Sequence, residues 1–205
     1  MTFGRTLIVI ALVTACSPSS QDQPAVGDPG LRDQLLARVT RDQAIRDTIT
    51  VQLREGDTAM PELIASMERI DSANLAWLKP QIQHGGFPTI AQVGREGVAA
   101  AALLVQHADA DPTFQAAVLP QIEVAFTAGV VNGEWVALLT DRVAKAQGRP
   151  QRYGTQATMT EGGRLVIDPI ADSVQVDARR AAMGLPPLAD YKRILDSVYA
   201  PPQAP

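Results

Sequence analysis

The hydrophobic pattern of this chain changes its period across one short polar segment, residues 148–156 (GRPQRYGTQ). Before this segment, apolar residues recur every three or four positions, the spacing of helices that bury one face. After it comes the only convincing strand pattern, folded around the turn sequence Glu161-Gly162-Gly163. The segment itself has no aliphatic side chain but two arginines, two glutamines and a tyrosine. We therefore expect helices followed by a hairpin, with a polar junction between them.

Several helices can be placed from this spacing. Residues 98–105 are apolar on all sides, which predicts a helix at the centre of the core. A short helix capped by Thr89 should precede it and reach Val93. Pro80 and Pro120 fall inside other helical stretches, where the missing N–H donor predicts a kink or a restart at Pro80 and a kink at Pro120. A first helix, with Arg and Asp on its opposite face, is predicted from the stripe Leu31, Leu35, Val39, Ile45, Ile49 and Leu53.

The strand pattern predicts that residues 153–160 pair with residues 164–168 as a β-hairpin. Two strands by themselves are marginally stable in water, so the hairpin should pack on the helices. The predicted fold class is mainly α, an irregular helical bundle with one β-hairpin near residues 153–168 packed on it. We expect a single domain over residues 31–200 and a loose tail, residues 201–205.

The N-terminal residues have the pattern of a secretion signal. Arg5 precedes an apolar run, residues 6–13, that is well short of the roughly 20 residues needed to span a membrane. The sequence VTAC that ends at Cys16 resembles a bacterial lipobox. This resemblance implies a signal peptide over residues 1–15, cleavage before Cys16 and acylation of that cysteine. A plain signal peptide with an incidental cysteine is the alternative.

A lipid anchor fits the rest of the N-terminal region. Cys16 is the only cysteine, so no intramolecular disulfide can form, and acylation would cap a thiol that is a liability in an oxidising compartment. Residues 16–30 are too poor in apolar surface to order themselves and should form a flexible tether. The expected partner is thus the membrane, reached through Cys16. Ser17 implies the outer membrane, facing the periplasm, if proteobacterial sorting applies.

The charge balance and the missing motifs narrow the range of functions. A net charge of −4 and a pI of about 5.2 argue against a nucleic-acid partner, which would need a basic surface. The sequence has no phosphate loop, no dinucleotide glycine fingerprint and no Gly-x-Ser-x-Gly motif. Its two histidines, His84 and His107, stand outside any His-Glu-x-x-His pattern. We expect neither a cofactor nor a metal site.

Two polar side chains fall on helix faces that should be apolar. His107 shares a face with Leu103 and Leu104, so it either meets the carbonyl end of its helix or acts as a general base or ligand oriented by Asp109. Arg142 lies on an apolar stripe and needs a carboxylate partner. It forms either a structural ion pair or a clamp for an anion. The candidate partners of Arg142 are Asp109, Asp141, Asp168 and Asp177.

Tyr153 and Gln156 complete the candidate site. If strand geometry begins at Tyr153, Tyr153 and Gln156 point to opposite faces, whereas Tyr153 and Thr155 share one. Gly154 allows close approach of a neighbour or a ligand. The alternative is a hydrogen-bonded seam that ties the hairpin to the helices. The candidate ligand-binding set is His107, Asp109, Arg142, Tyr153 and Gln156.

Taken in order, the polar blocks of the chain resemble an uncharacterised bacterial domain family. The blocks are QHAD at residues 106–109, FQ at 114–115, DR at 141–142, Q-x-YGTQ at 151–156, and D-x-RR followed by GL at 177–185. The resemblance covers roughly residues 71–191, and Phe87 stands where the family has a tryptophan. It implies that the polar blocks converge in one place, and it implies no activity.

Three functions are compatible with these residues. The favoured hypothesis is a lipid-anchored envelope domain that binds a small ligand or an envelope protein through a polar pocket. The second is a hydrolase or transferase with His107 as general base and Arg142 and Tyr153 steadying a developing negative charge. The third is a structural scaffold in which the polar blocks only join the hairpin to the helices.

Overall fold

The computed structural model describes residues 26–55, 60–160 and 165–199. The predicted signal peptide, Cys16, the predicted turn at residues 161–163 and the predicted tail lie outside these ranges. The helices in the described ranges are α1 (Pro29–Glu55), α2 (Met60–Gly85), α3 (Ile90–Gln106), α4 (Pro112–Thr127), α5 (Gly133–Ala146), α6 (Val176–Ala182) and α7 (Leu188–Tyr199). A 3₁₀ turn, η1 (Ser173–Gln175), and the strands β1 (Ala157–Met159) and β2 (Leu165–Ile167) complete the fold. The predicted class, mainly α with one hairpin, is confirmed.

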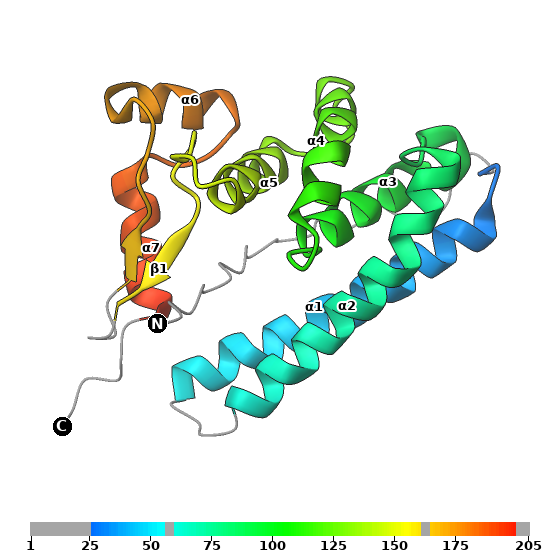
Figure 1. The fold of residues 1–205 in the computed structure, drawn as a ribbon, viewed down its shortest axis with the longest axis horizontal. Coiled ribbons are helices and arrows are strands. Elements are labelled where there is room, and N and C mark those ends of the chain that lie inside the picture. Colours follow the sequence, from blue (N-terminus) through cyan, green and yellow to red (C-terminus); the bar gives the residue numbers. More distant parts are fainter. Residues whose placement is uncertain (1–25, 56–59, 161–164, 200–205) are drawn as a thin grey trace, which may run out of the picture.

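The main core lies between the first five helices. α1 and α2 run side by side as two long helices, α3 packs on both, and α4 and α5 cover α3 (Figure 1). All residues from Gly97 to Gln106 except Ala99 are buried, which confirms that this helix is central. Each large side chain buried here, such as Leu104 and Ile122, contributes ~1.5–3 kcal/mol relative to exposure.

Local signals explain where most helices begin and break. Thr89 forms a capping box with Gln92, and α3 is interrupted at Gly94, whose φ of 71° and ψ of 172° are not helical. The short helix and the central helix predicted from the sequence are therefore the two halves of α3. α2 and α4 both continue past their internal prolines, Pro80 and Pro120. Of the two outcomes predicted at Pro80, a kink or a restart, the restart does not occur, because buried residues on both sides of the proline hold one helix against the core.

The start of α1 lies earlier than predicted. The helix begins at Pro29, and the Asp28 carboxylate accepts a hydrogen bond from the Leu31 amide (2.8 Å). The Gly27 and Asp28 amides donate to the carbonyls of Ala91 and Gln92, both at 2.8 Å. Residues 27–30, which the sequence assigns to the tether, thus belong to the folded domain.

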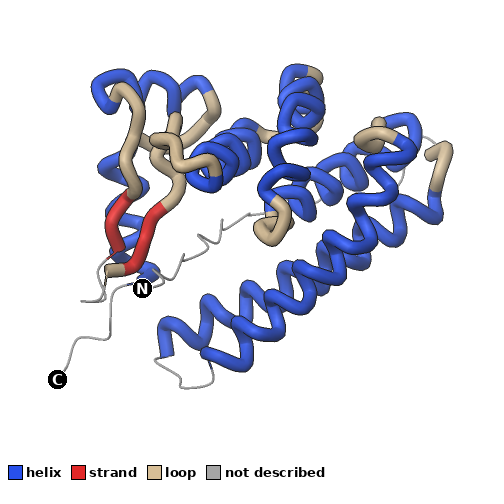
Figure 2. Tube along the Cα trace, in the orientation of Figure 1, coloured by secondary structure: helices blue, strands red, loops and turns tan. Residues whose placement is uncertain are grey.

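The C-terminal part forms a second, smaller layer. β1 and β2 pair antiparallel with Ala157 opposite Ile167, and α7 packs on this hairpin through Leu195. Figure 1 shows α5 between this layer and the long helices, and Figure 2 shows the loops that join α5 to the strands. Among the described residues, no helix has the length and apolarity needed to cross a membrane.

Candidate functional site

The polar junction is built around the carboxylate of Asp141, which is fully buried on α5. Its Oδ1 accepts hydrogen bonds from the backbone amides of Arg152 (2.7 Å) and Tyr153 (3.0 Å). Its Oδ2 accepts from the amide and the hydroxyl of Thr155, both at 2.9 Å. Residues 153–156 therefore wrap around one carboxylate instead of beginning a strand. The predicted strand geometry at Tyr153 is wrong, because these tertiary hydrogen bonds outweigh the local preference for a strand.

Two further buried side chains close the junction. The Gln151 amide donates to the carbonyls of Gln156 and Asp168, both at 2.9 Å, and its oxygen accepts from the Gln156 amide (2.6 Å). Arg180, with no exposed surface, donates to the Tyr153 carbonyl (2.7 Å). Such dense pairing is how a protein buries polar groups without loss of stability. The segment 151–156 is, in this respect, the seam predicted as the alternative.

A pocket of about 560 Å³ lies beside this seam, between α2, α5 and the turn that joins α3 to α4. Of the five candidate residues, the structure brings four to its wall and leaves out Tyr153, which is buried in the junction. The described residues that line the pocket are Glu68, Asp71, Ser72, His107, Asp109, Ala110, Pro112, Gln115, Arg142, Lys145, Ala146 and Gln156.

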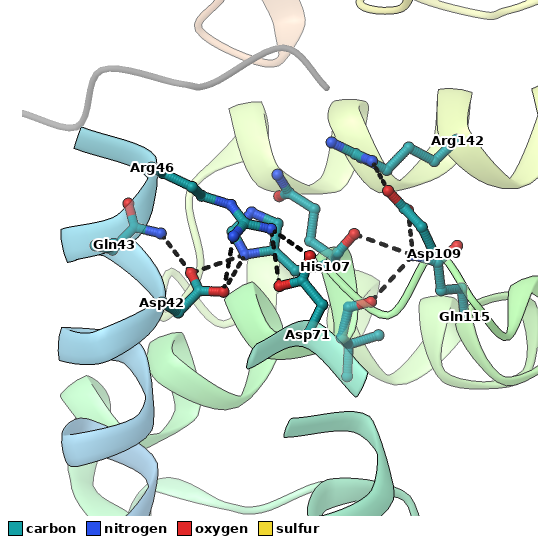
Figure 3. Close-up of polar contacts among 10 residues, drawn as sticks. Asp42, Gln43, Arg46, Asp71, His107, Asp109, Gln115 and Arg142 are labelled. Atoms are coloured by element: carbon teal, nitrogen blue, oxygen red, sulfur yellow. Dashed lines mark hydrogen bonds and ion pairs between the residues drawn. The ribbon is translucent and has the colours of Figure 1, made fainter. Parts of the chain in front are cut away.

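Arg142 finds its partner in Asp109, one of the four candidates. Nη1 of Arg142 donates to Oδ2 of Asp109 at 2.5 Å (Figure 3). The two members differ in burial, since the Arg142 side chain is 6% exposed and that of Asp109 is 39% exposed. Gln115 also binds Asp109, since its Nε2 donates a hydrogen bond to Oδ1 of Asp109 (3.1 Å). Two nitrogens of Arg142, Nε and Nη2, are buried without a hydrogen-bond partner among the described residues.

His107 is held by Asp42 of α1 and not by Asp109, the partner expected if His107 acts as a base or ligand. Its Nδ1 lies 2.9 Å and 3.0 Å from the two Asp42 oxygens (Figure 3). Because an ionised carboxylate only accepts, Nδ1 carries the proton and donates it, which leaves Nε2 with the lone pair. Asp109 does not accept a hydrogen bond from His107, because its carboxylate is engaged by Arg142 and Gln115.

Burial sets the protonation of this histidine. It lowers the pKa of His107 below its ordinary value, although the hydrogen bond to Asp42 acts in the opposite sense. The imidazole is therefore neutral at pH 7. Burial alone would raise the pKa of Asp42, but the hydrogen bond from His107 and the charge of Arg46 keep it below its ordinary value.

A buried arginine links Asp42 to a second carboxylate. Arg46 is 1% exposed, and its Nη1 lies 3.2 Å from Asp42 Oδ1. Its Nη2 donates to both oxygens of Asp71 at 3.0 Å. Burial raises the pKa of Asp71 to about 6, which outweighs the opposing effect of Arg46. Asp71 is therefore a carboxyl group that exchanges its proton near neutral pH at the wall of the pocket.

Asp42, Asp71 and His107 each offer a ligand atom within 4.8 Å of the others, a spacing that could hold a metal ion. Arg46, however, already pairs with both carboxylates and supplies the positive charge that they require. Asp42, Arg46 and Asp71 thus already form an ion-pair network. The absence of a metal site stays a prediction.

Nothing in the sequence singles out Asp71 of α2. Asp42 and Arg46 were also missed, because the Arg and Asp residues of the first helix were assigned to its solvated face. A signal was present in their spacing. Asp42 and Arg46 follow Leu35 and Val39 and precede Ile49 at intervals of three and four residues, so they lie on the buried stripe itself. Ile45, which the prediction used instead, is only half-buried.

The profile of a family of unknown function, DUF6624, matches residues 29–201. The chain belongs to this family. The match extends beyond residues 71–191, where the resemblance was noted, and takes in α1 with Asp42 and Arg46. No curated protein and no solved structure matches the chain. The family brings no assigned activity, and a bacterial origin stays a prediction.

Proposed function

We propose that this DUF6624 domain binds a small molecule through an anionic group, a carboxylate or a phosphate, with Arg142 as its anchor. The observation that carries the proposal is the state of Arg142 at the pocket wall, where one nitrogen is bonded and two are buried with no hydrogen-bond partner in the part of the chain that the structure describes. A buried donor without a partner costs ~1–3 kcal/mol. A ligand that satisfies these donors would therefore recover free energy on binding.

Asp109 occupies the position that the ligand anion would take. Its carboxylate comes from the turn between α3 and α4 and is partly exposed, whereas the guanidinium is fixed on buried α5. A ligand carboxylate that displaces Asp109 would offer two oxygens to the planar guanidinium, the geometry that arginine prefers. Lys145 adds little to this attraction because its Nζ pairs with Asp168 at 2.6 Å. The pocket has a volume typical of small-molecule sites.

The first test measures thermal shifts of the full chain carrying Cys16→Ser. Succinate and inorganic phosphate should raise the Tm, and the uncharged analogue succinamide should not. Arg142→Gln should abolish the response. An equal response to succinate in Arg142→Gln would refute the proposal, and no response in the parent chain would do so as well.

A matched variant sharpens the test because the expected change has the opposite sign. Asp109→Ala removes the internal competitor and leaves Arg142 unpaired, so we expect a loss of ~1–3 kcal/mol without ligand. Succinate should restore the lost stability, and it should bind Asp109→Ala more tightly than it binds the parent chain. Isothermal titration calorimetry of both proteins gives the comparison. Weaker succinate binding by Asp109→Ala would mean that Asp109 is part of the ligand site and not a placeholder.

We also propose that Cys16 anchors the domain to a membrane of the cell envelope. The support is the lipobox-like sequence before Cys16 and the absence of any other cysteine. Expression in a bacterium with labelled palmitate should give a labelled protein in the membrane fraction, and Cys16→Ser should give an unlabelled one. Equal labelling of both would contradict the anchor at Cys16.

A further inference from the structure

We infer that the pocket is catalytic, with His107 as the general base that activates water for hydrolysis of an anionic ester or amide. Asp42 is the positioning residue in this inference. The substrate class rests on the proposed function, since Arg142 would anchor the anionic end. The catalytic step rests on a different set of contacts.

The first support is the geometry of the pair. Asp42 is fully buried and is itself fixed by Gln43, whose amide donates to Oδ2 at 2.7 Å, and by Arg46. It therefore presents a rigid acceptor to Nδ1 of His107. This fixes both the ring orientation and the tautomer, the role of the carboxylate in hydrolytic triads. Since Nδ1 is engaged, Nε2 is the nitrogen left for a water molecule or a substrate.

The second support is location. His107 and Arg142 line the same pocket, His107 at the end of α3 and Arg142 on α5. A molecule anchored at Arg142 can therefore extend to the imidazole. The charged groups that face His107 are Asp42 and Arg46 from α1, Asp71 from α2 and Arg142 from α5. Burial keeps the ring neutral at pH 7, as a base requires.

The third support is what lines the pocket near this base. Among its described lining residues, Ser72 carries the only hydroxyl, and none is a cysteine. Lys145, the one lysine there, is paired with Asp168. Side-chain nucleophiles are thus scarce, and water is the nucleophile that this arrangement suits.

The step balances without any added reagent. Nε2 of His107 takes a proton from water as the water oxygen bonds to the carbonyl carbon, and the carbonyl π electrons move to its oxygen. The tetrahedral intermediate then collapses, the bond to the leaving oxygen or nitrogen breaks, and the proton on Nε2 passes to the leaving group. The products are a carboxylic acid and an alcohol or amine, and His107 returns to its neutral form.

The test uses two activated esters on the full chain carrying Cys16→Ser. One is mono-para-nitrophenyl glutarate, which carries a carboxylate, and the other is the uncharged para-nitrophenyl butyrate. We expect the anionic ester to be hydrolysed with the higher kcat/KM, and Arg142→Gln to remove this preference. His107→Gln, which can still donate to Asp42, should lower kcat ~100-fold or more. His84→Gln, at an exposed histidine, should change nothing.

Asp42→Asn should lower kcat more than it raises KM and should alter the acid limb of the pH–rate profile. Because this variant loses a buried charge beside Arg46, a second measurement uses only the parent chain. Diethyl pyrocarbonate modifies neutral imidazole, and mass spectrometry can follow His107 and His84 separately. His107 should react, with a midpoint below the ordinary histidine pKa of 6.5.

The outcomes separate the two proposals. Succinate binding together with hydrolysis that depends on His107 supports both. Succinate binding without hydrolysis of either ester, or with hydrolysis unchanged in His107→Gln, overturns the catalytic inference and leaves the binding proposal standing. Hydrolysis that requires His107 without succinate binding overturns only the anchor at Arg142. No modification of His107 by diethyl pyrocarbonate overturns the inference too, because Nε2 would then be out of reach.

Discussion

Asp141 and Arg142 are neighbours on α5, and both are buried charges, yet their surroundings are opposite. The Asp141 carboxylate accepts from three backbone amides and one hydroxyl, all from the junction. Arg142 has one bonded nitrogen, and that bond goes to a carboxylate that is partly exposed. The difference teaches how to separate roles inside one polar cluster. The Asp141 carboxylate makes its hydrogen bonds within the fold and stabilises it. The Arg142 guanidinium has unused donors beside a pocket and can offer them to a ligand.

The largest loss of stability is expected when the hydrogen bonds to the Asp141 carboxylate are removed. Asp141→Asn replaces a charged acceptor by an amide whose N–H groups face other donors, so several hydrogen bonds are lost together. We expect a loss of about 3–5 kcal/mol in the free energy of unfolding, measured by urea denaturation. Thr155→Val, which removes only the hydroxyl bond, should cost clearly less. A loss below 1 kcal/mol in Asp141→Asn would mean that the junction does not depend on this carboxylate.

A second, smaller effect is expected in the backbone of the same junction. Gly154 has a φ of +69°, and a Cβ there would lie 2.6 Å from Cδ1 of Ile170 and 3.0 Å from Cδ1 of Leu188. Gly154→Ala should therefore cost about 2–4 kcal/mol, from the left-handed backbone and from overpacking. Gly148→Ala is the matched control, since Gly148 has a φ of +68° and, apart from its chain neighbours, no atom of the described residues lies within 4 Å of its Cβ position. It should cost only the backbone part, ~1–2 kcal/mol. Equal losses of stability in the two variants would show that the side chains of Ile170 and Leu188 move aside without a measurable cost.

The sequence predicted those features that depend on neighbours along the chain. The buried helix at the centre of the core, the cap at Thr89 and the hairpin all follow from local spacing and local side chains. Asp109 was also among the partners considered for Arg142. Each of these depends on the period of a helix or a strand, or on a side chain that caps its own helix.

The rest depends on contacts between distant segments. Asp42 and His107 are 65 residues apart, and no spacing rule within one helix pairs them. The loop at residues 153–156 has a strand-like sequence but folds around Asp141, a residue of the preceding helix. In both cases a buried carboxylate decides the outcome, and the energy of a buried charge is set by tertiary structure.

The smallest predicted effect is a pH dependence of the stability, which comes from His107 and Asp71 at the pocket. The folded pKa of His107 lies below its ordinary 6.5, so the unfolded chain binds more protons there and stability falls as the pH drops below about 6.5. Asp71 acts in the opposite sense. Its folded pKa of about 6 exceeds the ordinary 3.8, so the folded chain binds more protons and stability rises as the pH drops from about 6 to about 4.

The two contributions oppose each other in the parent chain, and single substitutions should separate them. Asp71→Asn should lose stability more steeply than the parent between pH 6 and 4, and His107→Gln should lose it less steeply below pH 6.5. One pKa unit corresponds to ~1.4 kcal/mol, and the Asp71 side chain is 16% exposed. We therefore expect the Asp71 difference to be ~1–2 kcal/mol, read from urea denaturation at each pH. Parallel profiles for all three proteins would show that neither group changes its proton affinity on folding, so that burial in the pocket does not alter their protonation.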